Sequence, residues 1–213
     1  MIDKIYNAGF FFLLGYLFGS IPFAYLMSRI ATGIDIRKVG TGNAGALNSY
    51  ESTNKKWIGF AVLILDAGKG FIVFLLAKHF SYNDFHFVAM SFFASIIGHN
   101  YSIFLKFRGG RGLATTLGGI LPINPLYAIL WISMWFAGYY GIRKDVHIAN
   151  LTGIIGAPLL LLFAPAGVFY YFQIFYISTF NDYRIFYVIL SLILLLSHIR
   201  PLMKLMSKRL PKN

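Results

Sequence analysis

The stretch GFFFLLGYLFGSIPFAYLMSRI fills residues 9–30 and contains a single charged residue, Arg29. A helix needs about 20 apolar residues to cross the hydrocarbon core of a bilayer, which is about 30 Å thick. The stretch has no small-residue cleavage site followed by a polar mature segment, so we interpret it as a retained membrane span and not as a signal peptide. It predicts a membrane protein.

The composition of the whole chain supports this prediction. Of its 213 residues, 58% are hydrophobic and 12% are charged, which leaves more apolar surface than a soluble domain of this size could bury. Five further apolar segments follow the first, and we expect membrane-spanning helices at 9–30, 57–77, 86–105, 124–142, 148–176 and 185–199.

Two of the apolar segments need a separate interpretation. Residues 113–121 form a shorter apolar piece between a glycine-rich stretch and Pro122. Non-helical backbone is tolerated at membrane depth only inside protein or beside a wet cavity, so this piece is predicted to be a short seventh helix. Pro158 and Pro165 are expected to kink the segment 148–176, which is either one kinked helix or a helix followed by an interfacial segment.

The distribution of basic residues tests the number of spans. With the N-terminus outside and seven spans, 15 of the 19 Lys and Arg residues fall in inside segments, three fall outside and Lys69 lies within a helix. Positive residues concentrate on the cytoplasmic side of membrane proteins. The prediction is an all-α membrane protein with seven transmembrane helices, its N-terminus out and C-terminus in, as a single domain over residues 1–213.

The net charge of +12 indicates that the protein binds negatively charged molecules. The basic residues lie between long apolar segments and not on one continuous polar face, which disfavours nucleic-acid binding. They favour contact with anionic headgroups or phosphorylated substrates. The chain has no cysteine, so disulfides and thiol chemistry are excluded.

Two glycine-rich loops fall in inside segments. The first reads VGTGNAGALN at 39–48 and the second reads FRGGRGLATT at 107–116. Glycines let backbone N–H groups approach an anion, and a helix N-terminus and the guanidinium of Arg111 would add to the attraction for phosphate. The spacing fits neither a nucleotide P-loop nor a dinucleotide motif. Close helix packing is the alternative use of such glycines.

Few charged or titratable side chains lie within the predicted spans. Asp66 and Lys69 are three residues apart on one helix face and are expected to pair, because unpaired charges are costly in a membrane. His99 stands just before the second loop, and His198 ends the last helix. No Ser-His-Asp order, metal-type cluster or Cys nucleophile can be assembled, so covalent catalysis, a metal and a cofactor are not implied. The sequence therefore predicts a site that binds phosphate strongly and contains few residues suited to acid–base catalysis.

Four motifs in order then resemble a known family, the bacterial acyl-phosphate:glycerol-3-phosphate acyltransferases of phospholipid synthesis. They are GSIPF at 19–23 followed by Leu26, the loop at 40–48, the segment 66–70, and the stretch from Gly98-His99 through 107–112 to Thr115. The resemblance implies seven helices and a cytoplasmic active site. It also implies attack by a glycerol 3-phosphate hydroxyl on an acyl phosphate, with the acceptor's own phosphate as base, giving lysophosphatidic acid and phosphate.

The loops and the resemblance together predict the site residues. Catalytic roles are expected for His99, Arg111, Asn43 and His198. Contacts with phosphate or acyl phosphate are expected for Thr41, Gly42, Gly45, Gly109, Gly110, Gly112 and Thr115. Supporting roles are expected for Ser20, Asn48, Asp66 and Lys69. The expected partners are acyl phosphate, a small hydroxyl-bearing acceptor and membrane lipids, and this interpretation requires only a monomer.

The sequence departs from the family pattern at several positions. Thr41 and Arg111 replace a usual Ser and Lys and keep the hydroxyl and the charge, whereas Glu51 stands where the family usually has Arg, and Pro201 where it has Asn. A family stretch containing two serines appears as residues 147–150, with His147 and Asn150 at its ends. These changes suggest the hypothesis that the donor half of the site is retained and the acceptor half altered.

Two alternatives to the leading interpretation stay open. One is an acyl-phosphate-dependent enzyme with a different hydroxyl or amine acceptor. The other is a transporter of an anionic or phosphorylated solute, because intramembrane charges and broken helices also occur in transporters. Transporters often have paired halves, and the sequence shows no internal repeat.

Overall fold

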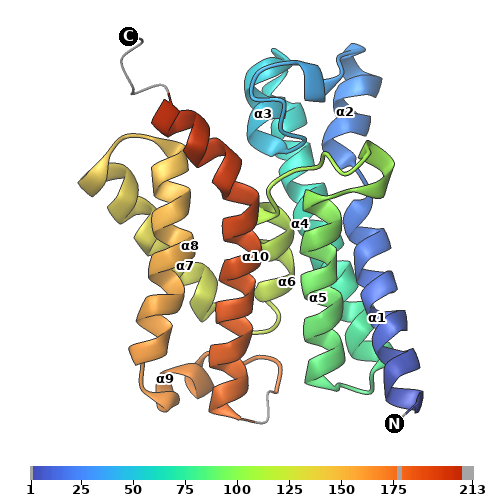
Figure 1. The fold of residues 1–213 in the computed structure, drawn as a ribbon, viewed down its shortest axis with the longest axis vertical. Helices are drawn as coiled ribbons and strands as arrows, with labels where there is room; N and C mark the ends of the chain where they lie inside the picture. Colours follow the sequence, from blue (N-terminus) through green and yellow to red (C-terminus); the bar gives the residue numbers. More distant parts are fainter. Residues whose placement is uncertain (1, 177–178, 208–213) are drawn as a thin grey trace. The chain divides into compact units, whose positions relative to one another are not determined.

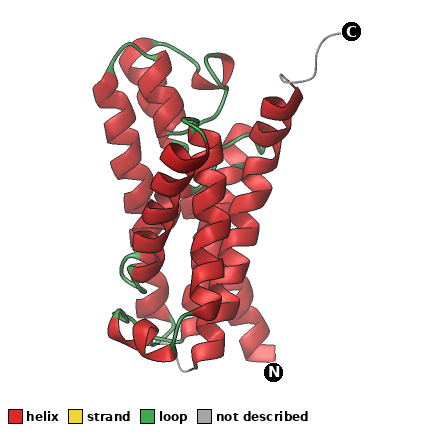
Figure 2. Ribbon diagram, turned by 90° about the vertical axis from the view of Figure 1, so that its left-hand side faces the viewer, coloured by secondary structure: helices red, strands yellow, loops and turns green. Residues whose placement is uncertain are grey.

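The computed structural model describes residues 2–176 and 179–207, and within them all regular structure is helical (Figures 1 and 2). The chain divides into two compact units, unit 1 at Met1–Pro122 and unit 2 at Ile123–Asn213. The all-α prediction is confirmed for the described residues. The single-domain prediction for residues 1–213 stays a prediction.

Unit 1 contains four longer helices and several short ones. Their bounds are α1 Ile2–Ser20, α2 Phe23–Thr32, η1 Ile36–Lys38, α3 Ala46–Ser52, α4 Lys56–Phe80, α5 Phe85–Asn100, η2 Ile103–Leu105 and α6 Leu113–Ile120. Helix α1 packs against α5, and α4 packs against both α6 and α5. Figure 1 shows α2, α3 and the loop that follows α5 at the same end of this unit, opposite the N-terminus.

The first apolar segment is two helices and not one. Helix α1 ends at Ser20 and α2 begins at Phe23, with Ile21 and Pro22 between them. Proline has no backbone N–H, and its ring clashes with the carbonyl one turn earlier, so it interrupts a helix. The span predicted over 9–30 is therefore built from two helices, and the segment Asn7–Thr32 is long and apolar enough to cross a membrane.

Unit 2 consists of α7 Leu126–Phe136, a π-helical turn at Ala137–Ile142, α8 Val146–Phe163, α9 Ala166–Tyr171 and α10 Phe180–Ser207. Helix α8 packs against α7 and α10. Pro158 lies inside α8, whereas Pro165 directly precedes α9. The segment predicted at 148–176 is thus a helix followed by a second short helix, because Pro165 stops α8 instead of kinking it.

Five helices in the described part of the chain are long and apolar enough to span a membrane by length and composition: Asn7–Thr32, Lys56–Phe80, Phe85–Leu105, Val146–Phe163 and Phe180–Met203. The apolar helix Leu126–Ile142 is shorter, and α6 has eight residues. The protein is a multi-pass membrane protein, while seven spans and the orientation of the ends stay predictions. Of the basic residues counted in the C-terminal tail, Lys208, Arg209 and Lys212 lie outside the described residues.

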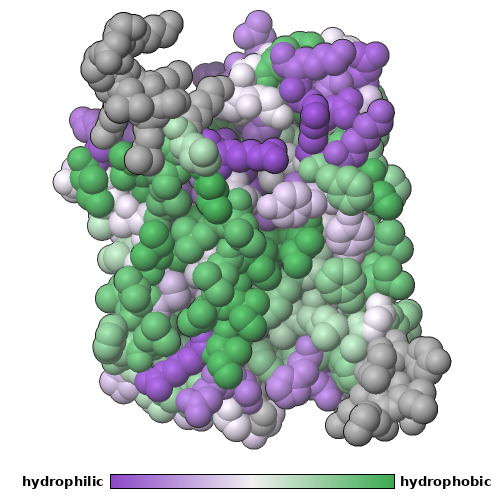
Figure 3. All heavy atoms as spheres, viewed as in Figure 1, coloured by the Kyte–Doolittle hydropathy of each residue, from purple (hydrophilic) through white to green (hydrophobic). Residues whose placement is uncertain are grey.

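The surface of unit 1 separates apolar from polar side chains. Large apolar residues of α4, such as Phe60, Ile64 and Phe71, are exposed, as expected for a helix in contact with lipid. Hydrophilic side chains gather at the end that carries α2 and α3 (Figure 3). The longer helices of unit 1 thus have the surface of membrane spans.

Helices α4 and α6 approach so closely that glycine is required at their contact. A Cβ added at Gly70 would overlap the carbonyl oxygen of Thr115, and one added at Gly118 would overlap that of Ala67. Small residues allow such backbone contact between membrane helices. These two glycines, which lie outside both glycine-rich loops, thus allow α6 to lie directly against α4.

We predict that Gly70→Ala lowers the melting temperature of the purified protein in detergent, because the added methyl group separates α4 from α6. Gly68→Ala is the matched control on the same helix, since a Cβ there meets nothing within 4 Å. Alanine is favoured over glycine in a helix by about 1 kcal/mol, so this control should keep or raise the melting temperature. Equal shifts in the two variants would contradict the close contact.

Candidate active site

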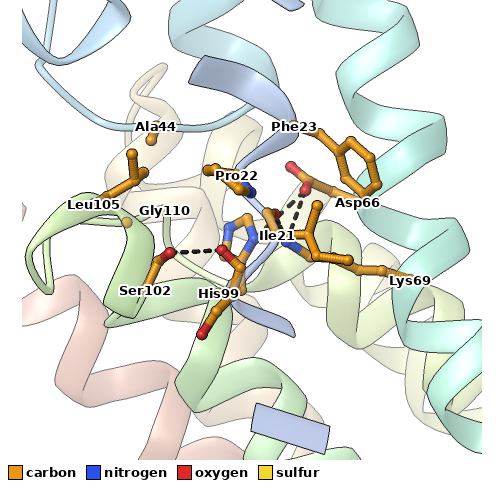
Figure 4. A pocket seen from close by; sticks show the side chains of 12 residues that line it. Ile21, Pro22, Phe23, Ala44, Asp66, Lys69, His99, Ser102, Leu105 and Gly110 are labelled. Carbon is orange, nitrogen blue, oxygen red and sulfur yellow. Dashed lines mark hydrogen bonds and ion pairs between the residues drawn. The ribbon is translucent and has the colours of Figure 1, made fainter. Parts of the chain in front are cut away.

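Unit 1 contains a small pocket, lined by both polar and apolar residues, at the break between α1 and α2 (Figure 4). Helices α4 and α5 and both glycine loops contribute to its wall. The lining residues are Ser20, Ile21, Pro22, Phe23, Ala44, Asp66, Lys69, His99, Ser102, Leu105, Gly109 and Gly110. The pocket therefore joins residues from all four motifs of the sequence.

Three titratable side chains form a buried cluster in the pocket wall. Lys69 Nζ lies 3.0 Å from Asp66 Oδ1, and His99 Nδ1 lies 3.6 Å from the same oxygen. Asp66 is 2% exposed, Lys69 3% and His99 7%. The predicted pairing of Asp66 with Lys69 is present in the structure. Because a buried charge is costly without a partner, each of these two ions depends on the other.

Lys69 also contacts the backbone at the break between α1 and α2. Its Nζ donates a hydrogen bond of 3.1 Å to the carbonyl oxygen of Ile21 and lies 5.8 Å from the centre of the Phe23 ring. The break leaves backbone carbonyls without helical N–H partners at membrane depth, where such groups must be satisfied by other parts of the protein. The ammonium group of Lys69 supplies that partner and ties α4 to the break.

The second glycine loop lies directly over His99. Gly110 N donates to the carbonyl oxygen of His99 at 3.0 Å, and Gly109 N donates to that of Asn100 at 3.1 Å. A Cβ at Gly110 would overlap Nε2 of His99. Glycine at this position therefore lets the loop backbone lie directly against Nε2 of the imidazole.

Two serines fasten the end of α1 to the segment after α5. Ser102 Oγ donates to the carbonyl oxygen of Ser20, and Ser20 Oγ donates to that of Gly98 at 3.4 Å. Ser20, predicted as a supporting residue, is buried in the pocket wall. Ser102 was not predicted; its position between His99 and the second loop is the signal that could have found it.

Asn48 organises the first glycine loop from inside. Its Nδ2 donates to the carbonyl oxygens of Ile36, Val39 and Asn43 at 3.0, 3.2 and 3.0 Å, and its Oδ1 accepts from Thr41 N at 2.9 Å. The side chain is 1% exposed. One buried amide thus sets the path of the loop.

The two glycine loops meet at the pocket. Ala44 N donates to the carbonyl oxygen of Gly109 at 3.4 Å, and both residues line the pocket. Before the first loop, Asp35 caps the short helix η1 and pairs with Arg37 at 2.8 Å. The hydrogen bond from the Arg37 side chain lowers the pKa of Asp35 to about 2, so this carboxylate stays ionised at neutral pH.

The glycine N–H groups predicted to cradle phosphate are engaged within the protein. Gly42 N donates to Val39 O and Gly45 N to Asn43 O, both at 3.0 Å, in addition to the bonds of Gly109 and Gly110. A phosphate contact with these four donors would require the bonds to open. The side chain of Thr41 is exposed and that of Asn43 is half-buried. Their contacts with the substrates stay predictions.

The start of α6 offers a different set of donors. Gly112 precedes it in a left-handed conformation (φ 81°) and, as a glycine, has no side chain that could cap the helix. The first backbone N–H groups of a helix have no partner within it, and they carry the positive end of the helix dipole. The buried hydroxyl of Thr115 has no hydrogen-bond partner among the residues that the structure describes. Arg111 stands beside this start, and burial lowers the pKa of its guanidinium, which stays positive because arginine titrates far above neutral pH.

The remaining predicted residues lie apart from this pocket wall or in unit 2. Glu51 is exposed on α3 and does not line the pocket. In unit 2, His198 is buried on α10 with Nδ1 2.8 Å from Leu194 O, and Asn150 accepts from Trp135 Nε1 at 2.9 Å. His147 lies in the first turn of α8, and Pro201 lies within α10. The roles of these residues stay predictions.

Comparison with known proteins identifies the family. Residues 9–208 match the family model described as glycerol-3-phosphate acyltransferase. The chain belongs to the glycerol-3-phosphate acyltransferase family. The predicted family and enzyme class are confirmed, and the transporter alternative is disfavoured.

Curated glycerol-3-phosphate acyltransferases support the assignment over most of their length. The one from Helicobacter pylori is 38% identical over 164 residues, which cover 73% of this chain and 72% of the relative. The one from Ehrlichia canis is 35% identical over 193 residues, which cover 91% of this chain and 92% of the relative.

Two crystal structures of PlsY, an integral membrane glycerol 3-phosphate acyltransferase, have a similar fold. Its glycerol 3-phosphate form has a TM-score of 0.73 at 29% identity, and its lysophosphatidic acid form has a TM-score of 0.75 at 28% identity. Each comparison covers 95% of this chain and 93% of PlsY.

For the first loop of this acyltransferase, we predict that Asn48→Asp speeds trypsin cleavage after Arg37 and Lys38. The substitution replaces the donating Nδ2, which bonds three carbonyl oxygens, by an oxygen that repels them. Asn54→Asp, at an exposed position after α3, is the matched control and should cleave at the wild-type rate. Unchanged cleavage in the Asn48 variant would show that other contacts hold the loop.

Proposed function

We propose that the protein transfers a fatty acyl group from an acyl phosphate to glycerol 3-phosphate in the pocket of unit 1. The acceptor hydroxyl oxygen attacks the acyl carbonyl carbon, the bond from that carbon to the phosphate oxygen breaks, and lysophosphatidic acid and phosphate result. The observation that carries the proposal is the meeting of both glycine loops with the buried Asp66–Lys69–His99 cluster around one pocket. The family assignment and the two ligand forms of PlsY support it.

The donor phosphate is proposed to lie at the start of α6. Helix N-termini attract phosphate through free N–H groups and the helix dipole, and arginine adds a planar pair of charged donors. Arg111 follows Gly110 of the pocket wall and precedes α6 by two residues. This arrangement would stabilise the charge that grows on the phosphate as the carbon–oxygen bond breaks.

We further propose seven spans, with α6 as the short one, and an active site on the cytoplasmic side of a bacterial inner membrane. The basic segments 28–56 and 106–112 belong to the end of unit 1 that carries α2, α3 and the loop after α5 (Figure 1). Positive segments favour the cytoplasmic side. The pocket is lined by residues of the same loops.

We predict that Arg111→Ala lowers kcat/KM for acyl phosphate by about 100-fold, since a charge-assisted hydrogen bond contributes about 1.5–3 kcal/mol. The assay measures phosphate and lysophosphatidic acid released by the purified protein. Arg108→Ala is the matched control, because Arg108 lies in the same loop and is exposed; it should stay within about threefold of wild type. Equal losses in both variants would indicate a general effect of loop charge and not a donor site.

The hypothesis of an altered acceptor draws on four positions, of which His147, Asn150 and Pro201 belong to unit 2 and Glu51 belongs to unit 1. The side chain of Glu51 is exposed and absent from the pocket wall, and a charge in water at a distance has a weak effect on a bound phosphate. Glycerol 3-phosphate is the acceptor we propose, because the family assignment supports it and Glu51 does not line the pocket.

For the acceptor, we predict that the wild-type protein uses glycerol 3-phosphate efficiently in a panel of hydroxyl and amine acceptors. Glu51→Arg and the charge-neutral control Glu51→Gln should each change the KM for glycerol 3-phosphate by less than about threefold. A wild type that prefers another acceptor, together with a Glu51→Arg variant that gains glycerol 3-phosphate transfer, would instead support the altered site.

A further inference from the structure

Two residues that lead into the second glycine loop have a backbone conformation that normally requires glycine. Lys106 has φ 53° and ψ 46°, and Phe107 has φ 60°. In this left-handed region the Cβ of any residue other than glycine comes too close to the following carbonyl oxygen. A positive φ is therefore uncommon outside glycine and is an outlier for a bulky residue. The strained pair stands between Leu105 and Gly109, which both line the pocket.

Backbone hydrogen bonds hold the pair in this conformation. At the end of η2, Phe107 N donates to the carbonyl oxygen of Ser102 at 2.8 Å, and Lys106 N donates to that of Ile103 at 3.4 Å. The two bonds have the pattern of a Schellman motif, in which the left-handed position, here Lys106, is usually glycine. The side chains of Lys106 and Phe107 are exposed. Burial of these side chains therefore does not compensate for the strain.

The strained pair leads into backbone donors that a phosphate could use. Gly109 N and Gly110 N now donate to the carbonyl oxygens of Asn100 and His99 at 3.1 and 3.0 Å, and we call this arrangement the closed loop. An open loop, in which these two bonds are broken, would let the residues before Gly109 return to ordinary φ values. The strain therefore raises the free energy of the closed loop alone and lowers the cost of opening it.

We propose that Lys106 and Phe107 are positioning residues of the donor site, whose strained backbone makes the closed loop ready to release the N–H groups of Gly109 and Gly110 to the phosphate of acyl phosphate. This inference rests on the function proposed above. Phosphate favours the open loop, because only there are the two N–H groups free, and a ligand shifts an equilibrium by such a difference in affinity. The strain increases the fraction of open loop and with it the apparent affinity for acyl phosphate.

The released donors would join those already proposed for the donor phosphate. Arg111 follows Gly110 in the chain, and α6 begins two residues later. The first N–H groups of α6 have no partner within the helix. A phosphate at this place could therefore bind the helix start and the opened loop together. The strain acts on binding of the donor and forms no bond in the reaction, so it affects KM and not kcat.

The test compares three substitutions of Lys106 that remove the same charge and differ in their tolerance of left-handed backbone. Glycine adopts this conformation freely, alanine adopts it at a cost, and β-branched valine disfavours it most. Relative to Lys106→Ala, we expect Lys106→Gly to raise the KM for acyl phosphate about fivefold, because the closed loop loses its strain, and Lys106→Val to lower it. The kcat and the KM for glycerol 3-phosphate should stay within about threefold of Lys106→Ala.

Hydrogen exchange measures the same equilibrium in the purified protein without substrate. The N–H groups of Gly109 and Gly110 exchange when their bonds open. Their exchange should be slowest in Lys106→Gly, intermediate in Lys106→Ala and fastest in Lys106→Val. Arg108 provides the matched control, because it is exposed in the same loop and has no positive φ. Glycine there only adds flexibility, so Arg108→Gly should exchange at least as fast as Arg108→Ala, with no higher KM for acyl phosphate.

The outcomes separate this inference from the proposed function. Equal KM values for acyl phosphate in Lys106→Gly and Lys106→Ala would overturn the positioning role, and so would a KM raised by both Lys106→Gly and Lys106→Val. An exchange rate that does not follow the order above would overturn it as well. Wild-type protein that transfers no acyl group from acyl phosphate to glycerol 3-phosphate would overturn the proposed function itself.

Discussion

The pocket of unit 1 depends on the buried contact of Lys69 with Asp66 and with the carbonyl oxygen of Ile21. Pro22 interrupts the first span and leaves polar backbone in a region where water is scarce. The ammonium group satisfies that backbone, and the carboxylate satisfies the ammonium group. Each of these polar groups would be costly to bury without its partner. The ion pair and the hydrogen bond therefore tie helix α4 to the break. The pocket lies at this break.

Glycine has two separate uses in this protein. At Gly70 and Gly118 it brings the backbones of α4 and α6 together, which is packing and not chemistry. At Gly110 it brings the backbone of the second loop against the His99 imidazole. The close α4–α6 contact also fixes the start of α6 relative to Asp66 and Lys69, which lie on α4. Gly70 and Gly118 therefore fix the position of α6, and Gly110 lies in the loop that leads into α6.

An apolar surface and a pocket that contains buried charges suit the reaction of this family. A fatty acyl group is insoluble in water, whereas glycerol 3-phosphate is charged. The exposed apolar residues of α4 face a lipid environment, and the lining of the pocket includes buried charges, serines and loop backbone. An enzyme that joins such substrates needs both surfaces in one unit, and the interrupted first span provides the transition between them.

The membrane helices, one buried ion pair and the family could be predicted from the sequence alone. Apolar length predicted the five helices of the described residues that are long enough to cross a membrane, because about 20 residues are needed whatever the tertiary contacts. Spacing on one helix determined the Asp66–Lys69 pair, and the motifs identified the family. The sequence also marked His99, Ser20 and Asn48, but not what they contact. Only the tertiary structure brought His99 to Asp66, engaged the glycine N–H groups in internal bonds and placed Glu51 outside the pocket wall. The physical reason is that periodicity describes contacts within one helix, whereas these contacts join helices and loops far apart in the chain, whose distances depend on packing.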